Sequence, residues 1–584
     1  MKYLLSSILL CFLLAGAAPE PQPASGKLSA LFAEEWDYEL KTSPEMATAI
    51  GDQRFNAELS DYSPAFPARD LEQKRAFLRR FEAIRPQDLR PSEAFNRQLM
   101  IRRLQTQINE IQDKQWEMPI DQFNGVHLLL AQLPSNTRFS TAKDYEDYIQ
   151  RLRQFPRAFE QLEETLRLGM RDRLMPPRYL LEKTVTQARE IAEAPIDASS
   201  FAAPVQKFPP ALSADEGKRF RADVLAAVEE NVRPAYRNLT QFLQNVYAPQ
   251  GRSEPGVWAI PHGDEYYRQQ VRIMTTTDRT PEQFHQIGLE QVREIENQML
   301  TLARTLGFSD LPSFHTSIQA NRKLYAKSGE QILQIYAGHI NDMRTKMPEL
   351  FGRQPKTPLE VVPMEAFRAK ESVPADYSPG SPVSGRPGRI NVNEYDPTHR
   401  LILNMEAIAY HEGIPGHHQQ FALAQEMTGL PEFRKFAEYN AFSEGWALYA
   451  ERLGKEVGFY RNPYSEYGRL ENEMWRAVRL VVDTGVHYKH WTRQQMVDFF
   501  HAHTAMDEPN VQTEVDRYIA WPAQALAYKA GQMKILELRE RTRRELGNRF
   551  DLRAFHDAVL ANGAVPLDVL DGQITAWAAK QKKE

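Results

Sequence analysis

Three histidines and three glutamates lie in two short segments of the chain, and their types fit a metal site. The first segment, residues 410–418, reads YHEGIPGHH, and the second, residues 443–451, reads SEGWALYAE. The candidate residues are His411, Glu412, His417, His418 and Glu444. A His-Glu pair, a further histidine and a distant helical glutamate make up the donor set of catalytic zinc sites, which activate water. This chemistry points to metal-assisted hydrolysis.

The spacing within the first segment departs from the common zinc motif HExxH, in which two histidines share one helical face at i and i+4. The i+4 position after His411 is Pro415, and His417 and His418 stand at i+6 and i+7. On an ideal helix, i+6 points away from i, and i+7 lies about 10 Å along the axis. Pro415 and Gly416 can distort the helix. We expect a two-residue bulge that returns one of the two histidines to the metal.

The second segment has the pattern of a buried helix. Glu444 has the apolar neighbours Phe442, Trp446 and Leu448. An unpaired carboxylate in such surroundings is costly, which favours metal ligation by Glu444. Glu451 lies on the same face two turns later, and it is a candidate acceptor next to the metal or a partner of an arginine.

The chain resembles the gluzincin metallopeptidases, helical enzymes that include the carboxypeptidase Taq and thimet oligopeptidase families. Gly416-His417 looks like the Gly-His that ends the zinc motif in several of these families. More closely, the chain is similar to the bacterial family called domain of unknown function 885 (DUF885). The similarity covers essentially all of the chain after its targeting segment, and it is carried by HEGIPGHHQQ, SEGWALYAERL, RLVVDTGVH and DRYIAWPAQALAYKAG.

The resemblance implies a mainly α fold of the large helical gluzincin-like type, with a small β-sheet next to the active-site helix and a central cleft. It implies one catalytic Zn²⁺ held by His411, His417 and Glu444, with Glu412 as the base that takes a proton from zinc-bound water. The Gly-His match favours His417 as the second histidine ligand, with His418 as the alternative.

Further candidates for catalysis lie downstream. His487 shares a polar helical ridge with Asp483, and we expect it to orient a ligand or to donate to the tetrahedral intermediate; the alternative is a structural role. Tyr518 and Tyr528 are candidates for the donor that stabilises the oxyanion, although either can be a core tyrosine. Arg517 is a candidate clamp for a substrate carboxylate.

Most of the chain shows helical periodicity, and strand signals are few. The segments 270–274, 359–362 and 389–393 are predicted as strands, and the Pro/Gly/Ser-rich segment 374–388 as a loop. We expect 389–393 to form an edge strand that pairs with an extended peptide substrate.

Composition and the N-terminus indicate an exported globular protein. The 584 residues carry a formal charge of −5, so nothing indicates a nucleic-acid or anionic-membrane partner. Residues 1–17 are predicted as a signal peptide cleaved near Ala17, and 18–26 as a linker. Cys11, the sole cysteine, lies inside the signal peptide behind a leucine, so we expect neither lipidation nor a disulfide. The product would be periplasmic or secreted, without membrane insertion after cleavage.

Residues 27–584 are predicted to form a single catalytic unit, with a helical half to about residue 255 and a motif-bearing half at 256–584. We expect a zinc-dependent peptidase that cleaves short peptides. Two alternatives stay open: a metal-dependent amidase or esterase that acts on a small non-peptide substrate, and a non-catalytic exported binding protein. The sequence does not give the oligomeric state.

Overall fold

The computed structural model describes residues 24–583, and these residues are mainly helical, as predicted. The predicted signal peptide and most of the predicted linker lie outside the described residues. The first helix begins at Ala24, so the last three residues assigned to the linker are helical. Among residues 24–583, no helix is long and apolar enough to span a bilayer.

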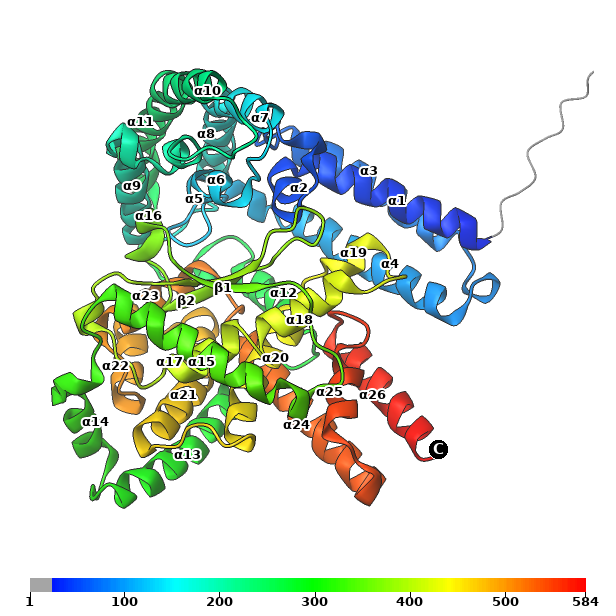
Figure 1. The fold of residues 1–584 in the computed structure, drawn as a ribbon, viewed down its shortest axis with the longest axis vertical. Coiled ribbons are helices and arrows are strands. Elements are labelled where there is room, and N and C mark those ends of the chain that lie inside the picture. Colours follow the sequence, from blue (N-terminus) through cyan, green and yellow to red (C-terminus); the bar gives the residue numbers. More distant parts are fainter. Residues whose placement is uncertain (1–23, 584) are drawn as a thin grey trace, which may run out of the picture.

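The first four helices pack against the motif-bearing part of the chain. They are α1 (Ala24–Thr42), α2 (Pro44–Ile50), α3 (Phe66–Glu82) and α4 (Pro91–Gln112). The apolar stripe of α1, which includes Leu31 and Trp36, is buried in the same core as Tyr410 and Trp446. Figure 1 shows these helices as a blue group beside the motif-bearing half. The first core therefore joins residues from both sides of the division expected near residue 255.

A second core lies within the next seven helices. They are α5 (Val126–Ala131), α6 (Leu133–Asn136), α7 (Ala142–Leu152), α8 (Phe155–Asp172), α9 (Arg178–Glu193), α10 (Ala214–Ala227) and α11 (Arg233–Phe242). The centre of this core holds Phe159 and Tyr236, whose rings meet edge to face at 4.8 Å. These helices form the group at the upper left of Figure 1.

Five helices lead into and accompany the sheet. They are α12 (Gly263–Thr275), α13 (Pro281–Thr305), α14 (Leu311–Ala320), α15 (Gly329–Leu350) and α16 (Ala366–Ala369). The predicted strand at 270–274 is wrong, because this segment belongs to α12. Its buried residues include Tyr267, Val271 and Thr275, which recur every four residues as one helical face requires.

The three strands form one small sheet. They are β1 (Leu359–Pro363), β2 (Ala375–Ser378) and β3 (Gly388–Val392), in the order β1-β3-β2. The strand predictions at 359–362 and 389–393 are confirmed. The predicted edge position of 389–393 is wrong, because β3 is the central strand, parallel to β1 and antiparallel to β2. Ile390 and Val392 of this strand are fully buried. The edge strand β2 lies within the segment predicted as a loop.

The remaining helices carry the motifs and the C-terminus. They are α17 (Met405–Glu412), α18 (His417–Glu426), α19 (Glu432–Lys435), α20 (Asn440–Glu456), α21 (Pro463–Tyr488), α22 (Arg493–His503), α23 (Glu508–Ala520), α24 (Leu526–Leu546), α25 (Leu552–Leu560) and α26 (Leu567–Gln581). Helices α20 and α24 cross closely at two glycines. A Cβ atom on Gly445 would lie 2.3 Å from the Cα atom of Gly531, so neither position has room for a side chain.

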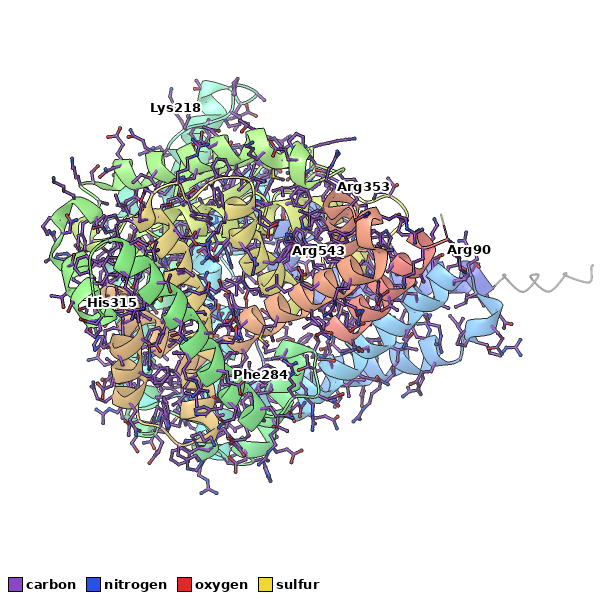
Figure 2. All side chains as sticks on the ribbon, turned by 90° about the horizontal axis from the view of Figure 1, so that it is seen from below. Arg90, Lys218, Phe284, His315, Arg353 and Arg543 are labelled. Carbon is purple, nitrogen blue, oxygen red and sulfur yellow. The ribbon has the colours of Figure 1, made fainter. Side chains whose placement is uncertain are left out.

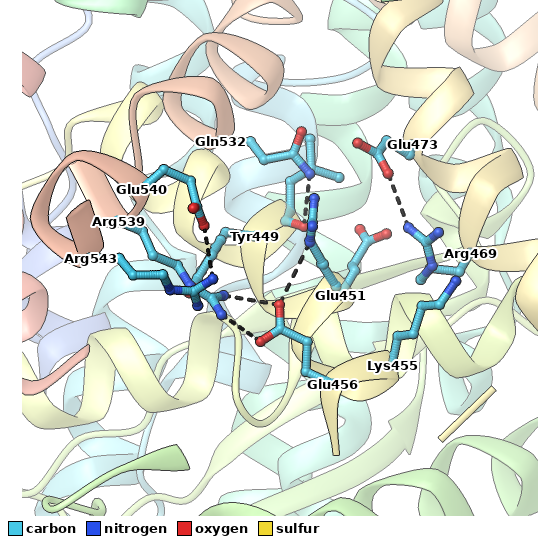
Figure 3. A network of polar contacts seen from close by, with 12 residues as sticks. Tyr449, Glu451, Lys455, Glu456, Arg469, Glu473, Gln532, Arg539, Glu540 and Arg543 are labelled. Atoms are coloured by element: carbon cyan, nitrogen blue, oxygen red, sulfur yellow. Dashed lines mark hydrogen bonds and ion pairs between the residues drawn. The ribbon is translucent and has the colours of Figure 1, made fainter. Parts of the chain in front are cut away.

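Charged side chains cover the outside of the molecule. Arg90, Lys218 and Arg543 are exposed on the outer faces of their helices or helix ends (Figure 2). At the outer end of α20, Glu456 forms an ion pair with Arg539 at 2.7 Å (Figure 3). This network reaches the second motif, because Arg539 donates to the Tyr449 hydroxyl at 2.8 Å, and Figure 3 shows Glu451 near it.

Candidate metal centre and substrate cavity

The first motif spans a break between two helices. His411 lies in the last turn of α17, and His417 is the first residue of α18. The chain turns between them at Gly413 and Gly416. A Cβ atom on Gly416 would lie 2.0 Å from the carbonyl oxygen of His411, so only glycine fits there. The expected bulge within one helix is therefore wrong: the six-residue spacing is accommodated by ending one helix and starting another.

This break brings His411 and His417 to Glu444, which lies on α20. Glu444 Oε2 is 3.4 Å from His411 Nε2 and 3.3 Å from His417 Nε2. One donor atom from each of the three residues lies within 4.8 Å of the other two. Tetrahedral zinc with ligands at about 2.1 Å separates its ligand atoms by about 3.4 Å. The three side chains therefore have the spacing of a zinc ligand set.

Two polar atoms of this triad lack hydrogen-bond partners within residues 24–583. Glu444 Oε2 and His417 Nδ1 are buried and accept or donate no hydrogen bond within residues 24–583. Buried polar atoms are normally satisfied, so an unpartnered carboxylate oxygen between two histidine nitrogens fits a cation-binding position. The residues present thus suit zinc.

Glu451 orients the first histidine. His411 Nδ1–H donates to Glu451 Oε1 at 2.8 Å. This tautomer leaves the lone pair of Nε2, the atom that can ligate a metal, facing Glu444. Arg476 pairs with the same carboxylate at 3.4 Å. Burial lowers the pKa of His411, but the neighbouring carboxylates of Glu444 and Glu451 outweigh it and raise the pKa to about 9. The surrounding carboxylates therefore favour positive charge at this position.

Glu412 follows His411 directly at the end of α17, and it lines the same cavity as the triad. Its side chain is buried, and burial raises its pKa to about 6, against the opposing effect of His411 and His417. A buried carboxylate next to a metal position has the environment of a general base.

His418 points away from the triad. Its Nε2–H donates to the carbonyl oxygen of Thr357 at 3.0 Å, and its Nδ1 accepts from the Tyr377 hydroxyl at 3.0 Å. Both ring nitrogens are therefore hydrogen-bonded, one to a residue of β2 and the other to the segment that precedes β1. Burial lowers the pKa of His418 to about 4. The structure thus brings His417 rather than His418 to Glu444.

Two cavities that share part of their lining lie at and beside the candidate metal centre. The site cavity has a volume of about 270 Å³ and holds the triad and Glu412. The large cavity, of about 770 Å³, lies between helices α1 and α4 and the motif-bearing half. Both are lined by Tyr377, Phe421, Glu438 and Asn440. Sequence reasoning missed these four residues, because none of them stands in a spacing that indicates chemistry.

Tyr528 and Arg517 line the site cavity, where the sequence predicts them. The Tyr528 ring stacks on His411, with ring centroids 6.0 Å apart. Arg517 Nη2 donates to the Tyr528 hydroxyl at 2.8 Å and to Gln524 Oε1 at 2.7 Å. Both side chains are thus held beside the metal ligands by direct contacts.

Tyr518 does not line the site cavity. Its hydroxyl donates to Glu514 and accepts from Trp475 Nε1 at 2.9 Å and from Arg479 Nε at 2.7 Å. With one donor and two acceptor positions filled, it has no capacity left for an oxyanion. The structure therefore does not bring Tyr518 to the position that its predicted catalytic role requires.

His487 is also outside the site cavity. Its Nδ1 accepts from the backbone N–H of Val257 at 3.1 Å, and its Nε2–H donates to the carbonyl oxygen of Tyr518 at 2.9 Å. Burial lowers the pKa of His487 to about 3. Its ridge partner Asp483 likewise accepts from the Tyr267 hydroxyl at 2.6 Å. His487 is thus a fully bonded neutral ring that joins three segments of the fold, and the structure does not bring it to the site where a catalytic role was predicted.

The family match agrees with the resemblance carried by the motifs. The family described as "Bacterial protein of unknown function (DUF885)" matches residues 44–574. The chain therefore belongs to the DUF885 family. No curated protein matches the chain.

Two solved structures share the fold. A "putative lipoprotein" from Colwellia psychrerythraea is 28% identical, with a TM-score of 0.89, and the alignment covers 95% of this chain and 99% of that one. A "putative lipoprotein of unknown function" from Shewanella oneidensis is 17% identical, with a TM-score of 0.67, and the alignment covers 94% and 99%. The second likeness concerns the fold alone.

Proposed function

We propose that this member of the DUF885 family is an exported zinc-dependent hydrolase that cleaves short peptides. The observation that carries the proposal is the convergence of His411, His417 and Glu444 on one position beside the buried Glu412. Export is supported by the predicted signal peptide and by the description of the similar solved proteins as "putative" lipoproteins.

His411, His417 and Glu444 would hold the ion, which when bound polarises a carbonyl group and lowers the pKa of its water. Glu412 takes a proton from the attacking water and passes it to the leaving nitrogen. Glu451 keeps the His411 ring in the tautomer that presents Nε2. The protein groups thus cover binding, orientation and proton transfer.

Tyr528 is the best-placed donor toward a developing oxyanion. Its hydroxyl accepts hydrogen bonds from Arg517 at 2.8 Å and Gln524 at 3.5 Å, so its own proton stays available. The ring lies against His411, one of the proposed ligands. A donor held in advance next to the reacting carbonyl stabilises the charge that forms there.

A peptide substrate is supported by the edge strand beside the cavity. β2 pairs with β3 on one side only, and its residues Ala375, Asp376 and Tyr377 line the site cavity. An extended peptide can bind next to such a strand through backbone hydrogen bonds. This proposal moves the substrate from β3, where the sequence placed it, to β2.

The function is tested with a peptide library and a matching set of small esters and amides, on the zinc-loaded parent and on Glu412→Gln. We expect peptide cleavage by the parent and a loss of about a thousandfold in the variant. Cleavage of esters alone would mean that the protein is an esterase and not a peptidase. Zinc-loaded protein with no activity on any of the three substrate classes would overturn the hydrolase.

A further inference from the structure

Three arginines line the wall of the site cavity that α21 and α23 form. Arg476, Arg479 and Arg517 all line the cavity, and all three are buried. Two carboxylates face them: Glu451 pairs with Arg476 at 3.4 Å, and Glu514 pairs with Arg479 at 2.9 Å. Burying a charge without a full partner is unfavourable. The opposite wall carries the carboxylates of Asp376, Glu412, Glu438 and Glu444, so an anionic group of the substrate would have to bind to an arginine on the α21 and α23 side.

Arg517 has the longest ion-pair distance of the three arginines. Its Nη1 lies 3.5 Å from Glu514, which is already bonded by Arg479 and by the Tyr518 hydroxyl. Its Nε is buried and has no hydrogen-bond partner within residues 24–583, and Arg476 Nε and Arg479 Nη1 also lack a partner within these residues. The Arg517 guanidinium lies over the ring of Phe123 at 5.2 Å, which fixes its plane. Arg517 is therefore held in place while retaining donor capacity.

The two sides of the metal position differ. On the His411 side lie Tyr528 and, bonded to its hydroxyl, Arg517. On the His417 side lies Phe421, with ring centroids 5.7 Å apart, and Phe421 also lines the large cavity. One side thus offers a cation within the small site cavity, and the other opens into a cavity of about 770 Å³.

We propose that Arg517 binds the free C-terminal carboxylate of a peptide substrate, so that the protein acts as a carboxypeptidase. The carboxylate accepts from the guanidinium on the His411 side, and the preceding residues extend past His417 into the large cavity. The charge-assisted contact selects a chain end over an internal segment. This inference rests on the proposed peptidase function and specifies its substrate.

Binding tests the inference without relying on turnover. The host is zinc-loaded Glu412→Gln, and the probes are N-acetylated alanine pentapeptides that end in a carboxylate or in a carboxamide. Calorimetry should give the carboxylate form about 30-fold tighter binding, because the amide leaves the buried cation unpaired. In the same host, Arg517→Gln should remove the preference for the carboxylate peptide. Arg517→Lys, made instead, should keep part of the preference because it retains the charge.

The matched control is Arg539→Gln in the same host. Arg539 is also a buried arginine with a carboxylate partner, Glu456, and it lies in the network at the outer end of α20 (Figure 3). We expect this variant to keep the full preference for the carboxylate peptide. Equal binding of the two peptides by the Glu412→Gln host would overturn the inference, and so would an unchanged preference after Arg517→Gln.

Product analysis separates this inference from the proposed function. With the parent enzyme, mass spectrometry should show shortening of the carboxylate peptide from its C-terminus and slow cleavage of the amide. Cleavage of both peptides at internal bonds and equal rates would overturn the carboxypeptidase while the peptidase stands. A parent that binds no zinc and cleaves neither peptide would overturn the proposed function itself.

Discussion

Two buried polar clusters lie in the motif-bearing half, and they differ in how completely their atoms are bonded. In the cluster of His487 and Tyr518, every ring nitrogen and hydroxyl position has a protein partner. In the cluster of His411, His417 and Glu444, the donor atoms converge but leave Glu444 Oε2 and His417 Nδ1 without a hydrogen bond within residues 24–583. A saturated cluster holds the fold together, whereas an unsaturated one has capacity for a ligand.

The same contrast applies to two tyrosines close in sequence. Tyr518 and Tyr528 are both buried and both contact arginines. Tyr518 donates its proton to Glu514, whereas the Tyr528 hydroxyl only accepts. Burial and residue type therefore do not separate a structural tyrosine from a catalytic one; the direction of the hydrogen bonds does.

The largest effect should follow from removing the base. Glu412→Gln keeps the shape of the side chain but cannot take a proton, so kcat should fall about a thousandfold. Zinc content, measured in the same preparation, should stay at the parent level because Glu412 is not in the ligand set. If the variant retained most of the parent's kcat, Glu412 would not be the base of the reaction.

The two tyrosines should separate in kinetics. Tyr528→Phe removes the proposed oxyanion donor, and kcat should fall about a hundredfold. Tyr518→Phe should leave kcat near the parent value and instead lower the free energy of unfolding by about 1–3 kcal/mol, because Glu514 loses a buried partner. Steady-state kinetics and urea unfolding of both variants check the pair. A loss of kcat in Tyr518→Phe, with a parent-like kcat in Tyr528→Phe, would contradict the distinction between the two clusters.

Glu451 should act on zinc affinity rather than on chemistry. Glu451→Gln weakens the acceptor that orients His411, so zinc affinity should fall about 10–100-fold. Competition with a zinc chelator measures this. Glu456→Gln, on the same helix but in the outer network, is the matched control and should bind zinc as the parent does. Equal affinities in the two variants would show that the His411 contact is structural.

The smallest effect concerns His487 and pH. Burial lowers the pKa of His487 to about 3, below its ordinary value near 6.5 in the unfolded chain. Between these values the unfolded chain binds the extra proton, so this residue's contribution to stability is lost as the pH falls below 6.5. From pH 7 to pH 5 the loss is about 2 kcal/mol.

His487→Gln removes this titration, so the parent should lose about 2 kcal/mol more than the variant between pH 7 and pH 5, as measured by urea unfolding. His501→Gln, which changes an exposed histidine on α22, should follow the parent. Identical pH dependence of His487→Gln and the parent would mean that His487 is not buried and neutral in solution.

The sequence predicted which histidines and which glutamate lie close together better than it predicted the residues around them. His411, His417 and Glu444 were recognisable because their types and order reflect ligand chemistry. The helix break between His411 and His417 was not, because a bulge and a break use the same Pro415 and Gly416. Whether the chain bulges or breaks depends on how closely the backbone at Gly416 packs against the carbonyl oxygen of His411.

Elements without a local signal were missed or misplaced. β2 lies in a Pro/Gly-rich segment, and it becomes a strand only by pairing with β3. The order β1-β3-β2 arises from such long-range pairing, so the central position of β3 has no signature within 389–393. The saturation of His487 likewise depends on Val257, which is distant in sequence.

The most direct test of the account is zinc content, measured by elemental analysis of the purified chain and of three histidine and glutamate variants. The account predicts about one zinc in the parent and in His418→Ala, and loss of zinc in His417→Ala and Glu444→Ala. A parent that stays free of metal after incubation with zinc would contradict the metal centre. Zinc retained by His417→Ala and lost by His418→Ala would contradict the ligand set.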